Sequence, residues 1–260
     1  MFSQLTFLGH ATTLIEMDGV RLLTDPILRS RVAHLNHRHG PVEVAAAQNV
    51  DAVLISHLHF DHFDLPSLRL LHPATRLIVP RGAAKLLKGF SRVEEVEMGD
   101  TITVGTVIIT ATYADHARQR HPFGPAADCL GFLIQGRYRL YFAGDTDLFP
   151  EMKDLAPNLD VALLPVWGWG PTLGKGHLTP QRAAEALTLL LPRLAVPIHW
   201  GSLHPLGMGW LKPRFLSDPP YSFIYHAEQL APQVRTELLM PGKMLSLTKI
   251  FSPIRDAYVK

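Results

Sequence analysis

Cysteine is nearly absent from this sequence, since Cys129 is the only one in 260 residues. A single cysteine excludes an internal disulfide, and chains without disulfides are typical of reducing compartments, so we expect a cytoplasmic protein. The amino terminus lacks the basic segment and apolar core of a signal peptide, and no run of about 18 apolar residues occurs. We therefore expect neither a signal peptide nor a transmembrane helix, and we place Cys129 in the core.

Charge of one sign is also scarce. The 25 basic and 23 acidic side chains give a formal net charge of +2 without a long run of like charge, so we expect no nucleic-acid partner. Hydrophobic residues make up 47% of the chain and charged residues 18%, which allows a sizeable core and excludes a disordered chain. The residue in excess is histidine, with 14 copies, and this excess is the first indication of metal or proton chemistry.

Short apolar runs bounded by Gly, Pro, Asp or Asn alternate with a few helical segments, as is typical of an α/β protein. The strongest turn signal is Asp18-Gly19, between strands predicted at 12–15 and 20–23. Helices are predicted at 65–72 and 179–191, with Asp64 and Thr179 as N-caps, and also at 83–87 and near Ala227. Further strands are predicted at 52–56, 76–79, 101–103, 106–112, 129–135, 139–143 and 194–198. Because no long polar linker divides the chain, we expect residues 1–260 to form one domain.

The two halves of the chain resemble each other. Residues 49–55 read Asn-Val-Asp-Ala-Val-Leu-Ile, and residues 158–164 read Asn-Leu-Asp-Val-Ala-Leu-Leu. Residues 14–25 and 133–145 both follow the order strand, turn, strand, aspartate. We interpret the similarity as an internal duplication, with chance similarity of short apolar strings as the alternative. A duplication predicts two halves that pack sheet against sheet, with the helices outside.

Segment 56–62 carries the most specific pattern, Ser-His-Leu-His-Phe-Asp-His. It follows an apolar, buried strand, and while the chain stays extended His57 and His59 point to one side. After a turn, Asp61 and His62 face a second point nearby. This spacing suits two metals better than one, and imidazole and carboxylate ligands without thiolate suit Zn, Mn or Fe. The alternative is a solvated polar loop in which Asp61 caps a helix.

Four further polar residues each follow an apolar strand, at the position where sites gather in α/β folds. They are Asp25, His116, Asp145 and His199. Taken singly, Asp145 is also compatible with a turn or cap, and His116 with an ordinary loop histidine. Together with segment 56–62, they form a convergent set.

These motifs closely resemble the metallo-β-lactamase superfamily. The resemblance rests on His-x-His-x-Asp-His at 57–62, a downstream histidine, Gly-Asp-Thr at 144–146 and Pro-Ile-His at 197–199, in matching order across nearly the whole chain. Leu-Gly-His-Ala-Thr at 8–12, Thr-Asp-Pro at 24–26 and the Trp-Gly that follows His199 are most similar to one branch. That branch contains L-ascorbate-6-phosphate lactonase and N-acyl-phosphatidylethanolamine-hydrolysing phospholipase D.

The resemblance implies an α/β fold in the form of a four-layer αβ/βα sandwich, with two mixed sheets packed face to face, helices outside and metals at one sheet edge. It implies two divalent metal ions, zinc first, with manganese or iron as alternatives. His57, His59 and His116 would hold one ion, Asp61, His62 and His199 the second, and Asp145 both. Asp25 would orient a ligand histidine through its other ring nitrogen. His10 either does similar work or is a packed histidine beside a glycine turn.

The implied activity is metal-dependent hydrolysis of an ester, lactone or phosphodiester bond in a small-molecule or lipid-like substrate. A hydroxide shared by the two metals would attack, and Asp61 would help to orient it. His177 is our candidate for protonating the leaving group, with an exposed histidine beside an N-cap as the alternative. Trp167 and Trp169 would form an apolar wall of the substrate pocket, or pack as ordinary loop residues.

Several other loop residues are weaker candidates. Phe123 and Trp210 could extend the apolar wall. We expect His34, His37 and His39 to be exposed, with binding of an anionic group as the alternative.

Three features bear on competing functions. The metal set lacks the thiolate of some β-lactam-hydrolysing members, and His59 stands where oxygen-reducing di-iron relatives place glutamate, which disfavours a redox role. One alternative function is a peripheral lipid hydrolase of the phospholipase D kind, whose aromatic stretch at 210–225 touches a membrane. Another is a non-catalytic metal-binding scaffold, against which the complete ligand set argues. A homo-oligomer is compatible with the sequence.

Overall fold

A computed structural model describes residues 2–40, 42, 44–119, 124–155, 157–208 and 214–252. The strands of its first large sheet are β1 (Gln4–Gly9), β2 (Thr12–Met17), β3 (Val20–Thr24), β6 (Ala52–Leu54), β7 (Arg76–Pro80), β8 (Val93–Val96) and β17 (Lys243–Ser246). Those of the second are β9 (Thr101–Val104), β10 (Val107–Tyr113), β11 (Leu130–Gln135), β12 (Arg139–Phe142), β13 (Val161–Pro165), β14 (Leu194–Ile198) and β16 (Arg235–Thr236). A small third sheet contains β4 (Arg31–Val32), β5 (Leu35–His37) and β15 (Leu203–Pro205).

The helices are short and few in the described part of the chain. The α-helices are α1 (Leu65–Leu68), α2 (Pro180–Leu190), α3 (Pro219–Leu230) and α4 (Leu247–Ile250). Single 3-10 turns are η1 (Val44–Ala47), η2 (Ala84–Leu86), η3 (Pro150–Asp154) and η4 (Arg214–Leu216). No helix among the described residues is long and apolar enough to cross a membrane.

The two large sheets share one internal design, as the predicted duplication requires. Their orders are β17-β1-β2-β3-β6-β7-β8 and β9-β10-β11-β12-β13-β14-β16, antiparallel in the first half of each and parallel in the second. Local details also match. Asn49 and Asn158, ahead of β6 and β13, are both left-handed, with φ of 56° and 61°. The carboxylates of Asp51 and Asp160 accept hydrogen bonds from the backbone N–H groups of Arg21 and Arg139, at 2.8 and 2.9 Å.

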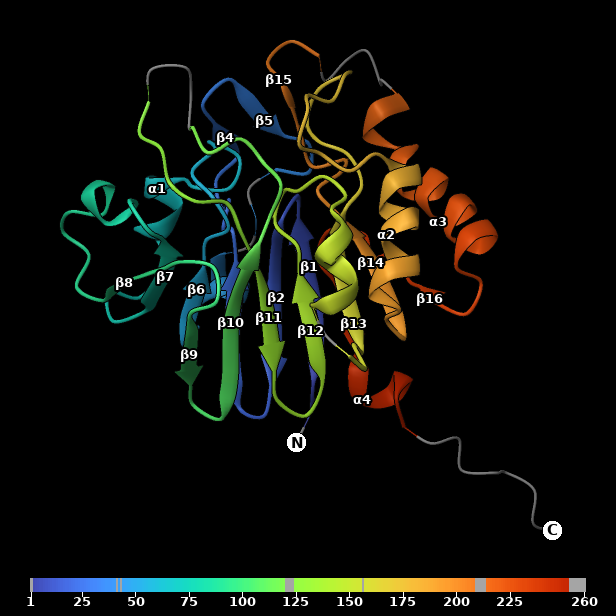
Figure 1. The fold of residues 1–260 in the computed structure, drawn as a ribbon. Coiled ribbons are helices and arrows are strands. Elements are labelled where there is room, and N and C mark those ends of the chain that lie inside the picture. The colour runs from blue at the N-terminus through green and yellow to red at the C-terminus, as the bar shows by residue number, and fades with distance from the viewer. Residues whose placement is uncertain are drawn as a thin grey trace.

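The sheets pack face to face across the main apolar core (Figure 1). Phe7 of β1, Phe132 of β11 and Phe142 of β12 belong to this core, and all three are fully buried. Burial of such a side chain contributes about 1.5–3 kcal/mol, so this layer supplies much of the driving force for folding. The outer face of the first sheet is covered by α1, η1 and η2, and that of the second by α2 and α3. The four-layer αβ/βα sandwich is therefore confirmed.

Helix α2 forms where the sequence predicts it. The Thr179 side chain caps the helix by accepting a hydrogen bond from the Arg182 N–H, and Pro180 occupies the first turn. The buried side chains Ala183, Leu187 and Leu190 recur at helical spacing and face the sheet. The helix ends at Leu191, whose φ of 45° is left-handed and cannot continue it.

Two predicted helices are shorter than expected. The helix predicted at 65–72 is a single turn, α1, although Asp64 caps it as predicted by accepting the N–H of Ser67. The segment predicted at 83–87 forms the 3-10 turn η2, in which Leu86 and Leu87 donate to carbonyls three residues back. Segments this short close few hydrogen bonds for the backbone entropy they lose, so the tighter turn replaces a full helix.

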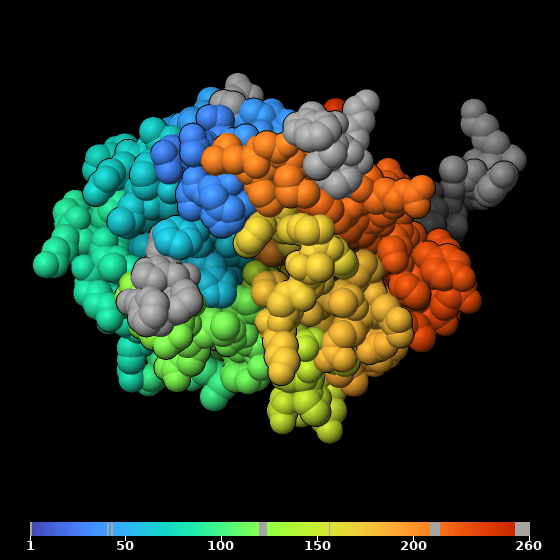
Figure 2. Space-filling model, turned by 90° about the horizontal axis from the view of Figure 1, so that it is seen from above, coloured from blue at the N-terminus to red at the C-terminus, as the bar shows by residue number. Residues whose placement is uncertain are grey.

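The carboxyl ends of β3, β6, β10, β12 and β14 lie at one edge of the sandwich, at the top of Figure 1. Asp25, the segment 56–62, His116, Asp145 and His199 follow these strands directly or within a few residues. Figure 2 looks onto this edge, where segments from most of the chain meet. The fold therefore concentrates the predicted site residues in one place.

Candidate metal centre

The structure brings all seven predicted metal ligands together as two adjoining groups. One group is His57, His59 and His116, and the other is Asp61, His62 and His199 together with His10; within each group the ligand atoms lie within 4.8 Å of one another. Asp145 lies between the groups. Its Oδ2 is 3.1 Å from Nε2 of His62 and 4.0 Å from Nε2 of His57, and its Oδ1 is 3.2 Å from Nε2 of His199.

The path of the chain after β6 explains why two groups form. The rings of His57 and His59 lie close together, with centroids 4.6 Å apart. The N–H groups of His62 and Phe63 then donate to the carbonyl of His59, at 3.1 and 2.9 Å. This turn carries Asp61 and His62 towards His199, while the ring of His62 still lies beside that of His57, with centroids 4.1 Å apart. The fully buried Phe63 anchors the turn in the apolar cluster on the outer face of the first sheet.

In the first group, each histidine uses one ring nitrogen for the protein and presents the other to the centre. Nδ1 of His57 lies 2.9 Å from Oγ of Ser56, and Nδ1 of His116 lies 2.6 Å from the carbonyl of Gly176. His59 is reversed, with Nε2 2.9 Å from the carbonyl of Gln119. A nitrogen that faces a carbonyl must carry the N–H, so in neutral rings the inner nitrogens of His59 and His116 are lone pairs. These two nitrogens lie only 2.9 Å apart.

The second group repeats this arrangement. Nδ1 of His62 donates to Oδ2 of Asp25 at 2.7 Å, and Nδ1 of His199 donates to the carbonyl of Trp167 at 2.7 Å. Their inner Nε2 atoms are 2.9 Å apart. With both rings neutral these are two acceptor nitrogens that repel each other at that distance, and a metal ion bound by both would relieve the repulsion. Among the described residues, Nε2 of His57 and Oδ1 of Asp145 also lack a hydrogen-bond partner although both are buried.

Asp25 and Ser56 form hydrogen bonds with histidines of the two groups. Asp25 is fully buried and accepts hydrogen bonds from the backbone N–H of Ser56 at 2.7 Å, from its hydroxyl at 2.5 Å and from His62. Burial raises the pKa of Asp25, and His62 and Ser56 oppose this shift. Ser56 did not emerge as a candidate from the sequence, although a hydroxyl directly before the first ligand histidine was the available signal.

The buried carboxylates of the centre carry negative charge that bound cations would neutralise. Asp25, Asp61 and Asp145 are all at most 6% exposed, so three carboxylates share one buried space. Burial alone lowers the pKa of His62, but Asp145, Asp61 and Asp25 outweigh it and raise that pKa well above its ordinary value. Burial keeps the pKa of His116 down at about 4, so its ring is neutral and able to bind a metal. Imidazole and carboxylate donors in this number fit divalent metal ions.

The structure places His177 at the edge of the centre. Its Nε2 is 3.5 Å from Oδ2 of Asp145, and its ring centroid is 4.6 Å from that of His116. Its Nδ1 lies 3.2 Å from the carbonyls of Gly174 and Lys175, and the side chain is partly exposed. Nε2 of His177 therefore faces the same space as the inner nitrogens of the two groups.

The two tryptophans differ in their relation to the centre. Trp167 touches it through its backbone carbonyl, while its ring packs on the main core and donates to the carbonyl of Gly170 at 2.9 Å. Trp169 packs against a small apolar cluster that includes Ile27 and Leu203, and its ring meets that of His34 edge-on. Both rings are half-buried.

Other sequence candidates have mixed outcomes. His34 and His39 are exposed as expected, but His37 is buried at 8% exposure, because β5 pairs with β15 and carries it inward. Cys129 is buried in the core as predicted, and burial raises the pKa of its thiol to about 12. Phe123 and Trp210 lie outside the described residues.

Comparisons with known proteins agree with this geometry. A family model described as a beta-lactamase superfamily domain matches residues 20–200. A metal-dependent hydrolase of Methanopyrus kandleri is 31% identical over 92% of this chain and 98% of its own length. An N-acyl-phosphatidylethanolamine-hydrolyzing phospholipase D of Caenorhabditis elegans is 29% identical over 80% of this chain and 67% of its own length. A metallo hydrolase of Ignicoccus hospitalis has the same fold, with a TM-score of 0.71 and 24% identity over 95% of this chain and 98% of its own.

Two facing mixed sheets with a histidine and aspartate cluster at one edge define the metallo-β-lactamase fold. The chain belongs to the beta-lactamase superfamily and, within it, to the family of metal-dependent hydrolases that includes the Methanopyrus protein.

Proposed function

We propose that this protein binds two divalent metal ions, zinc first, and hydrolyses an ester, lactone or phosphodiester bond. His57, His59 and His116 would hold one ion, Asp61, His62 and His199 the other, and Asp145 both. One observation carries the proposal: two separate pairs of ring nitrogens, His59 with His116 and His62 with His199, face each other at 2.9 Å as acceptors. With neutral rings, each pair directs its two lone pairs at a point of its own, which favours a dinuclear site.

The side chains of the centre divide the chemical work. When bound, two such ions lower the pKa of coordinated water and draw charge from the attacked group. Asp61 would help to orient the attacking water. A proton on Nε2 of His177 would pass to the leaving oxygen, since this atom faces the centre while Nδ1 is held by backbone carbonyls.

A phosphodiester is the first bond to test. The Caenorhabditis relative is a phospholipase D that hydrolyses N-acyl-phosphatidylethanolamine, and its 29% identity spans 80% of this chain. Lactones and acyl esters follow as the next two substrate classes. The screen would use metal-loaded protein, with zinc and manganese compared.

Metal content per chain is the deciding measurement. Protein purified without added metal or chelator would be compared with His59→Ala and with the control variant His226→Ala, on the outer helix α3. We expect about two equivalents in the wild-type and control proteins and clearly fewer in His59→Ala. No metal in any of them, with no uptake when metals are offered, would exclude the metal-dependent enzyme and the metal-binding scaffold alike.

A second candidate, a peripheral lipid hydrolase, rests on the surface of α3. Tyr221 and Tyr225 lie one turn apart there, with 61% and 62% of their surfaces exposed. Exposed tyrosines are favourable at a membrane interface, where one end of the ring is apolar and the other polar. Co-sedimentation with phosphatidylethanolamine-containing liposomes tests this candidate. Binding that a Tyr221→Ser/Tyr225→Ser double variant loses would support it, and absence of wild-type binding would exclude it.

A further inference from the structure

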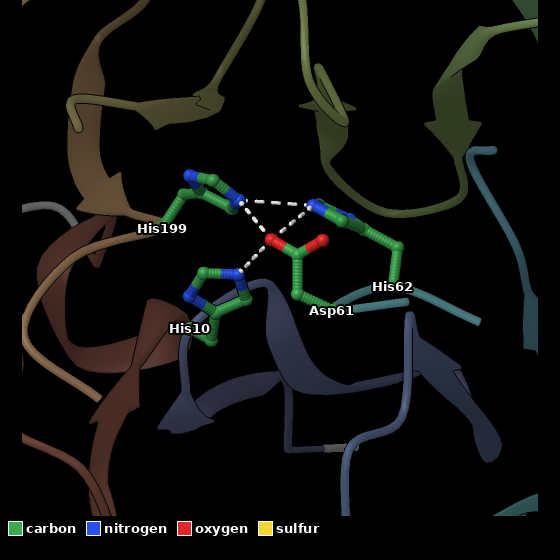
Figure 3. Close-up of side chains that lie close together, drawn as sticks. All are labelled: His10, Asp61, His62 and His199. Carbon is green, nitrogen blue, oxygen red and sulfur yellow. Dashed lines mark hydrogen bonds and ion pairs between the residues drawn. The ribbon is translucent and has the colours of Figure 1, made fainter. Parts of the chain in front are cut away.

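His10 is held from several sides at the second group of the centre (Figure 3). Its Nε2 lies 2.8 Å from Oδ2 of Asp61, and its ring stacks at a slant on that of His199, with centroids 3.9 Å apart. Its backbone carbonyl accepts the N–H of His199 at 2.7 Å, and its own N–H donates to Oγ of Ser202 at 2.8 Å. The residue is fully buried.

The backbone at His10 takes a conformation that side chains rarely adopt. Its φ is 55°, and Gly9 before it has a φ of 126°. A side chain at position 9 would come within 2.9 Å of Oγ of Ser202. Such strain costs roughly 1–3 kcal/mol and persists where the surroundings fix it. Here the surroundings are the hydrogen bonds that tie the β1–β2 turn to the end of β14.

The hydrogen-bonding pattern of the two ring nitrogens of His10 is the reverse of that in His62 and His199. His62 and His199 give Nδ1 to an acceptor in the protein and turn Nε2 inward. His10 turns Nε2 to a carboxylate, while its buried Nδ1 has no hydrogen-bond partner among the described residues. A carboxylate oxygen accepts and cannot donate, so the 2.8 Å contact with Asp61 requires the proton on Nε2. The geometry therefore fits an Nε2–H donor, with the lone pair at Nδ1.

Resting on the dinuclear site proposed above, we propose that His10 is a positioning residue for Asp61 and not a metal ligand. Its Nε2–H holds Oδ2 of the carboxylate, and its ring supports His199 from the side. A neutral donor suits this role, because a second positive group beside the metal would compete with it. Partners of this kind typically account for about 10- to 100-fold in metal affinity.

Three variants separate the loss of the His10–Asp61 hydrogen bond from the loss of ring packing and from backbone strain. His10→Phe keeps a ring of similar shape without the donor. His10→Asn tolerates the positive φ but is too short to reach Asp61. His10→Gln is long enough to restore an N–H donor. The probe is Zn²⁺ alone, titrated into metal-free protein against a chelator, with Co²⁺ absorption as a second readout and circular dichroism of the metal-free proteins as the folding control.

We expect the wild type to bind two equivalents of Zn²⁺. In His10→Phe and His10→Asn, the weaker equivalent should lose about 10- to 100-fold in affinity while the tighter one is unchanged, and His10→Gln should recover part of the loss. Wild-type affinity in either folded loss variant would overturn the role. A His10→Gln variant as weak as His10→Phe, with a Co²⁺ spectrum showing one nitrogen ligand fewer, would make His10 a ligand instead. A wild type that binds a single equivalent would remove the dinuclear function itself, and the inference with it.

Discussion

The hydroxyl of Ser56 donates a hydrogen bond of 2.5 Å to Oδ2 of Asp25. The same carboxylate oxygen accepts Nδ1–H of His62 at 2.7 Å, and the Ser56 oxygen lies 2.9 Å from Nδ1 of His57. Because the hydroxyl proton is committed to Asp25, the Ser56 oxygen accepts from His57. One buried carboxylate thus orients a histidine of each group, one directly and one through a serine.

This arrangement predicts a graded effect on metal binding. Asp25→Asn should weaken both Zn²⁺ equivalents, by about 10- to 100-fold each, because the amide cannot accept every bond that the carboxylate accepts. Ser56→Ala should weaken mainly the equivalent held by His57. Chelator competition measures both. Asp51→Asn, at the opposite end of β6, is the matched control, and equal losses in all three variants would contradict the arrangement.

Gly144 is required by close packing beneath the centre. It has a φ of 62°, and a Cβ there would lie 2.6 Å from Cβ of Ser56 and 2.8 Å from the carbonyl oxygen of Leu130. We expect Gly144→Ala to lower the free energy of unfolding of the metal-free protein by more than the roughly 1–3 kcal/mol of backbone strain alone. Urea unfolding measures this. Gly19 has a φ of 83°, and a Cβ there would meet nothing within 4 Å, so Gly19→Ala measures the cost of backbone strain alone. Equal losses of unfolding free energy in Gly144→Ala and Gly19→Ala would exclude crowding at Gly144.

His177 should affect turnover without affecting metal content. Its Nε2 faces Asp145 at 3.5 Å from the edge of the centre, and the proposed ligand set holds both ions without it. If it protonates the leaving group, His177→Ala should lower kcat by about 10²- to 10⁴-fold on a substrate with a poor leaving group, and far less with a nitrophenolate leaving group. Metal analysis of the same samples is the control. Unchanged kcat on the poor leaving group would remove His177 from the reaction.

His37 should make stability depend on pH. Burial, with His39 and His204 nearby, lowers its pKa from 6.5 to about 4. Between pH 6.5 and pH 4 the unfolded chain binds a proton on His37 that the folded chain does not. His37 therefore leaves the free energy of unfolding unchanged above about pH 6.5 and lowers it progressively as the pH falls towards 4. The loss at pH 4 is about 3 kcal/mol for a shift of this size.

The variant His37→Leu isolates that contribution. Its free energy of unfolding, measured by urea titration from pH 4 to pH 8, should change less below pH 6.5 than that of the wild type. Above pH 7 the difference between the two proteins should be constant. Parallel curves over the whole range would show that His37 does not titrate as inferred.

Local signals in the sequence were enough for several elements and for the motif at 57–62. The caps at Asp64 and Thr179 and the turn at Asp18-Gly19 depend on neighbours within a few residues, and all three form as predicted. The His-x-His-x-Asp-His spacing already divides its own members between two points, because an extended stretch followed by a turn is a local property. The length of α1 and the 3-10 form of η2 were missed, since short helices depend on packing more than on propensity.

What the sequence determined by itself was the class of chemistry: histidine and carboxylate ligands after apolar strands, without thiolate, in the order of one superfamily. Only the tertiary structure decided how those groups are oriented. His10 and Asp61 are 51 residues apart, Asp25 and Ser56 are 31 apart, and His62 and His199 are 137 apart. The partner of each ring nitrogen depends on how the two sheets pack and where each strand ends, and no local pattern encodes it. The same reason placed His37 inside, because its burial follows from pairing with β15, more than 160 residues away in the chain.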